Sequence, residues 1–125
     1  MPSDPYNDLV RARFENPVHA AADGPGYAGQ VSASAAVSGQ GNRVTLEAHI
    51  VDGRIADIRF RAWGCPYLIA AAETVCCELE GRESTALKTV SANDLAAKLS
   101  VPTTRLGRLL LIEDAAARLL EKTGV

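Results

Sequence analysis

The sequence has few aromatic residues, few cysteines and no long hydrophobic run. Aromatic side chains make up only 5% of its 125 residues, so the hydrophobic core must be built mainly from aliphatic side chains. The hydrophobic runs are far too short to cross a bilayer, and the three cysteines are an odd number with no CxxC spacing. These absences argue against a membrane protein, a disulfide scaffold and a zinc finger.

Neither sign of charge is in large excess. Thirteen Lys and Arg against fifteen Asp and Glu give a formal net charge of −2, which argues against a basic surface for nucleic acid. The first residues, 1–5, lack the charged and hydrophobic regions of a signal peptide. We therefore expect one cytoplasmic domain spanning residues 1–125, with reduced thiols and no nucleic-acid or membrane partner.

Three segments alternate between hydrophobic and polar residues with the period of a β-strand. They cover residues 31–38, 44–51 and 57–63. The Asp52-Gly53 dipeptide between the last two is a strong signal for a hairpin, and residues 39–42 are interpreted as the turn between the first two. The pattern predicts an antiparallel sheet with one polar and one hydrophobic face.

Hydrophobic residues recur at helical spacing before and after these strands. Helices are predicted over 5–15, from Pro66 towards a C-cap at Gly81, from an N-cap at Ser91 until Pro102, and over 104–122. The order helix, three strands, helices predicts an α+β fold, in which helices pack on one face of a three-stranded antiparallel sheet.

Cys65 is the residue best suited to chemistry. It lies between the end of the third predicted strand and Pro66, a favourable first residue of a helix. The positive end of a helix favours the thiolate, which is the form that acts as a nucleophile or binds a soft metal. The alternative interpretation is a small buried residue at a strand–helix junction.

The other two cysteines are adjacent and lie about three helical turns further along. Cys76 falls on the hydrophobic stripe of its helix, which predicts a place in the core. Cys77 shares a face with Glu73 and Glu80 and is expected to be more exposed, beside carboxylates that raise the pKa of a thiol. Neither is expected to reach Cys65.

The remaining candidates for chemistry are weak. His19 and His49 are scattered and do not form a converging set of metal ligands. Arg59, Arg61 and Asp57 share one face of the third strand, which is interpreted as a solvated surface, with a partner-binding patch as the less favoured alternative.

Taken in order, these segments resemble the IscU/NifU N-terminal/SufU family of iron–sulfur cluster assembly scaffolds. The best-matching parts are Phe60-x-x-x-Gly64-Cys65, Glu113-Asp114-Ala115 and the opening helix with its Asn16-Pro17. The resemblance implies the family's fold, which SufE proteins also resemble, with helices on a three-stranded antiparallel sheet. It also implies a role in cluster biogenesis that is not enzymatic, and a cysteine desulfurase as partner.

The sequence departs from this family at its cluster-binding positions. Family scaffolds hold a cluster or zinc with three cysteines, an Asp and often a His. The first Cys and the Asp are replaced here by Gln40 and Asn42, and the last His-Cys pair by Gly107-Arg108. These replacements are poor partners for a soft metal. Cys65 is therefore the only remaining candidate to bind a cluster or metal.

The resemblance and the departures leave three hypotheses open. In the first, the chain is a divergent scaffold-like protein, and the Cys65 residues of a homodimer share a cluster with exogenous thiols. In the second, Cys65 accepts persulfide sulfur from a cysteine desulfurase, as SufE proteins do with a single cysteine at another position. In the third, the chain is an adaptor without chemistry. An iron–sulfur cluster, zinc or no cofactor at all is compatible with the sequence.

Overall fold

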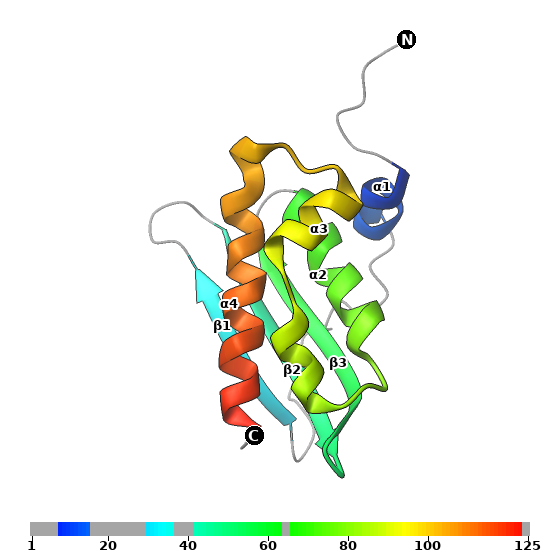
Figure 1. Cartoon of the computed structure of the whole chain (residues 1–125), viewed down its shortest axis with the longest axis vertical. Helices are drawn as coiled ribbons and strands as arrows, with labels where there is room; N and C mark the ends of the chain where they lie inside the picture. The colour runs from blue at the N-terminus through cyan, green and yellow to red at the C-terminus, as the bar shows by residue number, and fades with distance from the viewer. Residues whose placement is uncertain (1–7, 16–29, 37–41, 64–65, 124–125) are drawn as a thin grey trace.

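The computed structural model describes residues 8–15, 30–36, 42–63 and 66–123. Its elements run in the order α1 (Asp8–Glu15), β1 (Gln30–Ala36), β2 (Arg43–Val51), β3 (Arg54–Trp63), α2 (Pro66–Leu79), η1 (Ser84–Thr89), α3 (Ala92–Leu99), η2 (Thr103–Arg105) and α4 (Leu106–Lys122) (Figure 1). The elements η1 and η2 are short 3₁₀ helices. The sequence pattern does not predict η1, and it assigns residues 104 and 105 of η2 to the last helix. The α+β class, with helices packed on a small antiparallel sheet, is confirmed.

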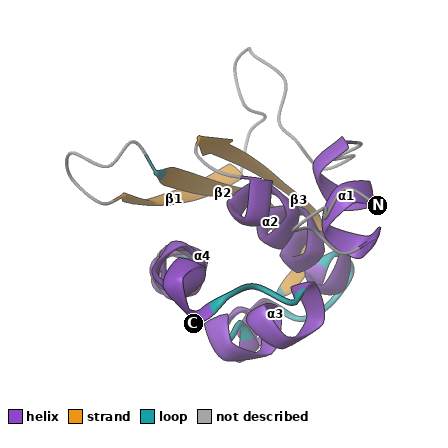
Figure 2. Cartoon of the chain, turned by 90° about the horizontal axis from the view of Figure 1, so that it is seen from above, coloured by secondary structure: helices purple, strands orange, loops and turns teal. Residues whose placement is uncertain are grey.

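The sheet has three antiparallel strands in the order β1-β2-β3. In β2, Val44, Leu46 and Ala48 are buried, whereas the residues between them are partly exposed. Figure 2 shows helices on one side of this sheet. The alternation therefore separates a hydrophobic face, covered by helices, from a polar face, as the period of two predicts.

Two helices form the layer that covers the sheet. The helix α4 packs against β1 and β2, and α2 packs against β3. The helix α3 and η1 lie against α4, and α1 packs against α2 (Figure 2). The fully buried side chains between these elements are aliphatic, among them Leu46, Ile58, Leu68, Leu109 and Ile112. None of the helices in the described ranges is long and hydrophobic enough to span a membrane.

Two turns adopt the left-handed backbone that the sequence predicts for them. Asp52 and Gly53 have φ values of 53° and 75°, as a tight hairpin turn with positive φ at both central residues requires. Gly81, with φ of 86°, follows the end of α2 as the predicted C-cap glycine. The segment after it is held by the hairpin, because Ser84 N donates to Gly53 O at 2.8 Å and Ile55 N to Arg82 O at 2.7 Å.

The strand β3 begins three residues earlier than predicted, at 54 and not at 57. Ile55 is fully buried and the next buried residue is Ile58, so the alternation of period two is broken between them. The cause is a register shift opposite His49 and Ile50, which leaves Ala56 without a partner in β2. A bulge of this kind inserts one extra residue into a strand. A search for alternation of period two therefore finds only the part of β3 that follows the bulge.

The helix α3 ends at Leu99, and not at Pro102 as predicted. Ser100 adopts a left-handed conformation with φ of 53°, and Val101 N donates to Ala96 O at 2.9 Å. This bond satisfies a carbonyl group at the helix end. The residue in the left-handed conformation that makes such a bond possible is usually a glycine. A serine at this position gives no recognisable stop signal, so the sequence pattern assigns the end to the next proline.

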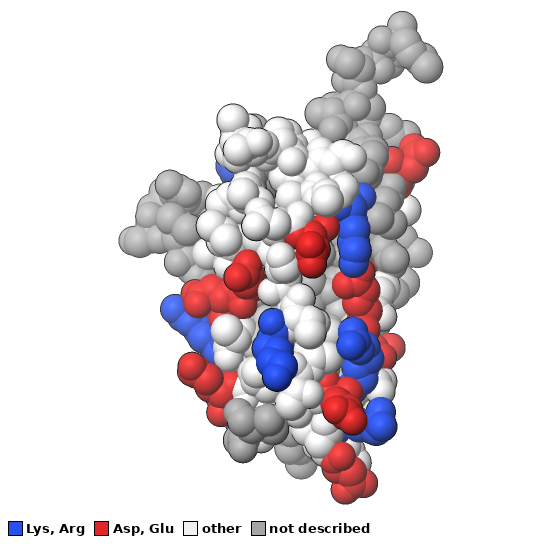
Figure 3. Space-filling view, viewed as in Figure 1, with Lys and Arg blue, Asp and Glu red and all other residues white. Residues whose placement is uncertain are grey.

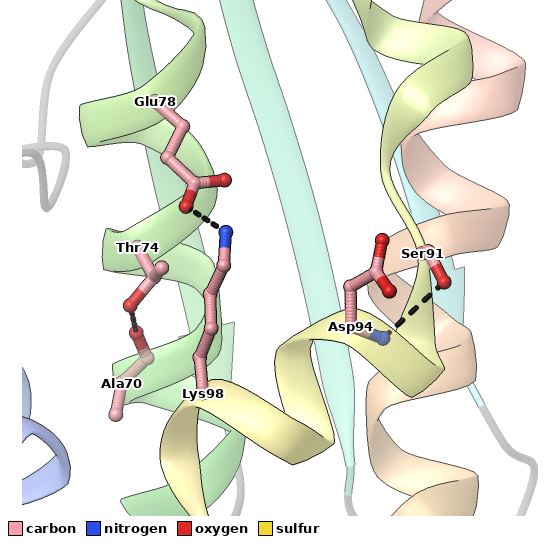
Figure 4. A network of polar contacts seen from close by, with 6 residues as sticks. All are labelled: Ala70, Thr74, Glu78, Ser91, Asp94 and Lys98. Atoms are coloured by element: carbon pink, nitrogen blue, oxygen red, sulfur yellow. Dashed lines mark hydrogen bonds and ion pairs between the residues drawn. The ribbon is translucent and has the colours of Figure 1, made fainter.

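The start of α3 is satisfied by two side chains. Ser91 Oγ accepts a hydrogen bond from Asp94 N at 3.3 Å, as the predicted cap requires (Figure 4). Glu113 Oε2, from α4, accepts a second one from Ala92 N at 3.0 Å. Glu113 belongs to the Glu-Asp-Ala motif of the family resemblance, so this part of the motif has a structural role in joining α3 to α4.

An ion pair joins α3 to α2 on the other side. Lys98 Nζ contacts Glu78 Oε1 (Figure 4). One turn earlier on α2, the Thr74 hydroxyl donates to Ala70 O at 2.8 Å within the buried part of the helix. Both side chains of the ion pair are about half exposed, so the pair contributes little to stability.

Candidate functional site

The described cluster-ligand positions implied by the family resemblance lie near one end of the sheet. The strand register places Ala36, Arg43 and Trp63 side by side, so the chain leaves β1, enters β2 and leaves β3 at this end. The helices α2 and α4 also start there (Figure 1). We call this end of the sheet, with the first turns of α2 and α4, the ligand end.

The structure describes three of the five predicted site residues. Cys65 and Gln40 lie outside the described residues, so their roles remain predictions. Asn42 directly precedes β2 and is buried, with 7% of its surface exposed. Gly107 is exposed in the first turn of α4, and Arg108 beside it is half-buried. The three described residues therefore lie at the starts of β2 and α4, at the ligand end.

The described residues of the ligand end do not match the ligands of a cluster. Asn42 offers an amide, Gly107 has no side chain, and the Arg108 guanidinium has only donors and does not deprotonate. Across the described ranges, no three His, Cys, Asp or Glu residues lie close enough to hold a metal ion. An iron–sulfur cluster needs four strong ligands, and the described side chains at this end supply none.

Arg108 places a positive charge in the first turn of α4, at the ligand end. Its Nε atom is buried and has no hydrogen-bond partner among the described residues. An unsatisfied buried donor is destabilising, and a cation in the first turn of α4 also adds to the positive end of the helix dipole. A nearby anion would reduce both the cost of the unsatisfied donor and the repulsion from the helix dipole. The ligand end is therefore suited to stabilising a negative charge.

The structure confirms the predicted difference between the adjacent cysteines. Cys76 is fully buried, and its burial, followed by the charge of Glu73, raises the pKa of this thiol far above its ordinary value. Cys77 is half-buried, and its thiol donates a hydrogen bond to Glu73 Oε2 at 3.1 Å. Cys76 is therefore a core residue and is held in the neutral form.

The face that Cys77 shares with Glu73 is more buried than the sequence pattern predicts. Glu73 is completely buried, whereas Glu80 on the same face is exposed. The reason is that α1 packs against α2, so that α2 is covered on more than its sheet side. Glu73 is the polar residue that pattern reasoning missed, because no residue close in sequence signals a buried carboxylate.

The buried thiol gives a direct test. We expect Cys76 to react with iodoacetamide at least about tenfold more slowly in the folded protein than in urea, because each unit of raised pKa lowers the thiolate fraction tenfold. Mass spectrometry of peptides after timed labelling measures the rate. Equal rates for Cys76 in the folded and the unfolded protein would contradict the burial of this thiol.

Comparison with protein families identifies the chain's relatives. The family model described as "NifU-like N terminal domain" matches residues 5–122. The chain belongs to this family. Its members are scaffold proteins of iron–sulfur cluster assembly that are not enzymes, and they interact with cysteine desulfurases. The family resemblance and the expectation of a role other than catalysis are thereby confirmed.

Solved structures share the fold of this NifU-like chain. A SufU scaffold protein of the SUF system from Fervidobacterium islandicum AW-1 is 15% identical, with a TM-score of 0.73 over 93% of this chain and 96% of that one. A NifU-like N-terminal protein from Brucella abortus is also 15% identical, with a TM-score of 0.69 over 93% and 92%. At these identities the likeness shows the fold alone. No curated protein matches the sequence.

Proposed function

We propose that this NifU-like chain acts in iron–sulfur cluster biogenesis as a divergent scaffold-like protein whose one retained ligand cysteine is Cys65. The observation that carries the proposal is the combination of the family match over residues 5–122 with an amide and a guanidinium, Asn42 and Arg108, at two positions of the ligand set. The chain keeps the fold of a scaffold, but the family's ligands are replaced at the positions that the structure describes.

A single thiolate cannot satisfy a [2Fe–2S] cluster, which takes four strong ligands. Cys65 therefore binds a cluster or zinc only together with thiols from outside the chain. In this proposal those thiols come from the Cys65 of a second copy and from small exogenous thiols. The cluster is the cargo of such a dimer, and a cysteine desulfurase is the partner that supplies its sulfur.

A second function is favoured by the Nε atom of Arg108, which is buried and has no hydrogen-bond partner among the described residues. In it, the Cys65 thiolate attacks the outer sulfur of a persulfide on a cysteine desulfurase. A new S–S bond forms at Cys65, the S–S bond of the donor breaks, and the desulfurase cysteine leaves as a thiolate, so no external oxidant or reductant is needed. Positive charge at the ligand end stabilises both the attacking thiolate and the persulfide anion.

Anaerobic reconstitution with iron and sulfide tests the first function. Wild type, Cys65→Ala and the control Cys77→Ala are compared by metal analysis, visible spectrum and gel filtration. We expect wild type and Cys77→Ala to develop a cluster chromophore in a dimeric fraction, and Cys65→Ala to develop none. A chromophore that survives in Cys65→Ala would overturn the role of this cysteine.

Incubation with a cysteine desulfurase and cysteine, followed by intact-mass analysis, tests the second function. A gain of one sulfur on Cys65, without bound iron in the reconstitution, supports the sulfur acceptor and rejects the cluster-binding dimer. Absence of both products, with Cys65→Ala still binding the desulfurase as tightly as wild type, rejects both functions. That outcome would leave the adaptor as the function of this chain.

A further inference from the structure

A cleft of about 350 Å³ lies at the opposite end of the molecule from the ligand end. Its walls come from the start of β3, the turn after α2 and the short helix η1, which meet in the lower part of Figure 1. We call it the hairpin cleft. Its volume lies at the lower end of the range found for small-molecule sites.

The lining of the hairpin cleft is cationic. Arg54, Arg82 and Lys88 line it together with one carboxylate, that of Glu83. Three positive charges against one negative charge leave a net charge of +2, whereas the whole chain carries −2. The cleft therefore has the opposite sign of charge from the protein as a whole, and its local field attracts anions.

Within the described part of the chain, these cations form no ion pair. Figure 3 shows positive and negative side chains interspersed over the lower part of the helical face, and several described cations elsewhere have a carboxylate partner, as in the pairs Arg61–Glu47, Lys98–Glu78 and Arg118–Asp114. In the cleft, Arg54 Nη1 donates to the Gly81 carbonyl at 3.5 Å. None of the three cleft cations forms an ion pair with a carboxylate of the described residues.

The backbone holds the walls of the cleft in place. Ile55 N donates to Arg82 O and Gly81 N to Ile55 O, both at 2.7 Å. Arg54 also pairs with Glu83 in an isolated antiparallel bridge. The two arginines therefore stand on one hydrogen-bonded unit, so a ligand would not have to order this backbone when it binds.

We propose that the hairpin cleft binds a small anion that carries at least two carboxylate or phosphate groups. Each guanidinium can hold one such group through two parallel hydrogen bonds, and the Lys88 ammonium adds a third positive charge. The Thr85 side chain, which also lines the cleft, supplies a neutral hydroxyl. This site uses no residue of the ligand end and does not depend on the function proposed there.

Titration of the full chain with citrate, and separately with pyrophosphate, tests the proposal by NMR. We expect saturable shifts of the amide signals of residue 54 and residues 81–89. Arg82→Gln is expected to weaken the Kd at least about tenfold, because it removes a charge-assisted hydrogen bond. Whichever of the two anions binds more tightly shows whether carboxylate or phosphate is the preferred group.

The matched control is Arg59→Gln. It removes the same charge, but Arg59 is exposed, pairs with Asp57 at 3.5 Å and lies outside the cleft. We expect its Kd to stay within about twofold of wild type. Lys88→Gln, on a different wall of the cleft, repeats the test in case Arg82→Gln does not fold.

Three results would overturn the proposal. The first is the absence of saturable shifts with either anion up to a concentration on the order of 10 mM. The second is an equal loss of binding in Arg59→Gln and Arg82→Gln, which would show general charge attraction. The third is binding of a glutamate-rich peptide without binding of either small anion, which would assign the cleft to a protein partner.

Discussion

Replacing Leu109 by alanine is expected to lower the free energy of unfolding by about 3 kcal/mol. Leu109 is fully buried in the hydrophobic core, on the helix α4 that packs against β1 and β2. Its truncation removes buried hydrophobic surface and leaves a cavity, which together cost about 2–5 kcal/mol for a buried leucine. Urea denaturation followed by circular dichroism measures the loss.

The adjacent residue provides the control. Leu110 has 52% of its surface exposed, so Leu110→Ala is expected to change the free energy of unfolding by less than about 0.5 kcal/mol. The two variants remove the same atoms from neighbouring positions of one helix. Equal losses in both would contradict the orientation of α4 on the sheet.

Restoring the family's ligands is expected to give this chain a metal site. The variant that combines Gln40→Cys, Asn42→Asp, Gly107→His and Arg108→Cys with the native Cys65 contains the full family set. A Cβ at Gly107 would meet no atom within 4 Å, so the structure has room for a side chain there. Thiolates and an imidazole are strong zinc ligands, and the positive charge of the half-buried Arg108 is removed.

We expect this fourfold variant to bind one zinc ion per chain, at least about a thousandfold more tightly than the wild type. Competition with a chromophoric chelator measures the affinity, and metal analysis measures the stoichiometry. The same variant with Cys65→Ala is the control and should lose most of the gain. A folded fourfold variant with the zinc affinity of wild type would show that the ligand end no longer places these positions together.

Local patterns were sufficient for the parts of the fold in which neighbours along the chain determine the conformation. The Asp52-Gly53 turn, the left-handed Gly81 and the Ser91 cap each depend on a few consecutive residues. Their backbone preferences act within one turn of the chain, so they are visible in the sequence. The β3 bulge and the Ser100 stop were missed because no special residue marks them.

For the candidate site, too, the sequence shows some features and the tertiary structure shows others. The replacement of family ligands by Asn42 and Arg108 is visible in the sequence once the resemblance is recognised. That Asn42 is buried and that the Arg108 Nε lacks a partner among the described residues depend on the surrounding elements. The hairpin cleft could not be predicted either, because Arg54 meets Arg82 only after β3 and the end of α2 come together.

The sequence alone determined a small α+β domain with an aliphatic core. This follows from the periodic patterns, the scarcity of aromatic residues, the near balance of positive and negative charges, and the absence of long hydrophobic runs. Only the tertiary structure decided which of the neighbouring leucines, Leu109 or Leu110, enters that core, and that Glu73 is completely buried. The physical reason is that periodicity specifies the spacing of a hydrophobic stripe, whereas the elements that pack around a helix determine how wide its buried surface becomes.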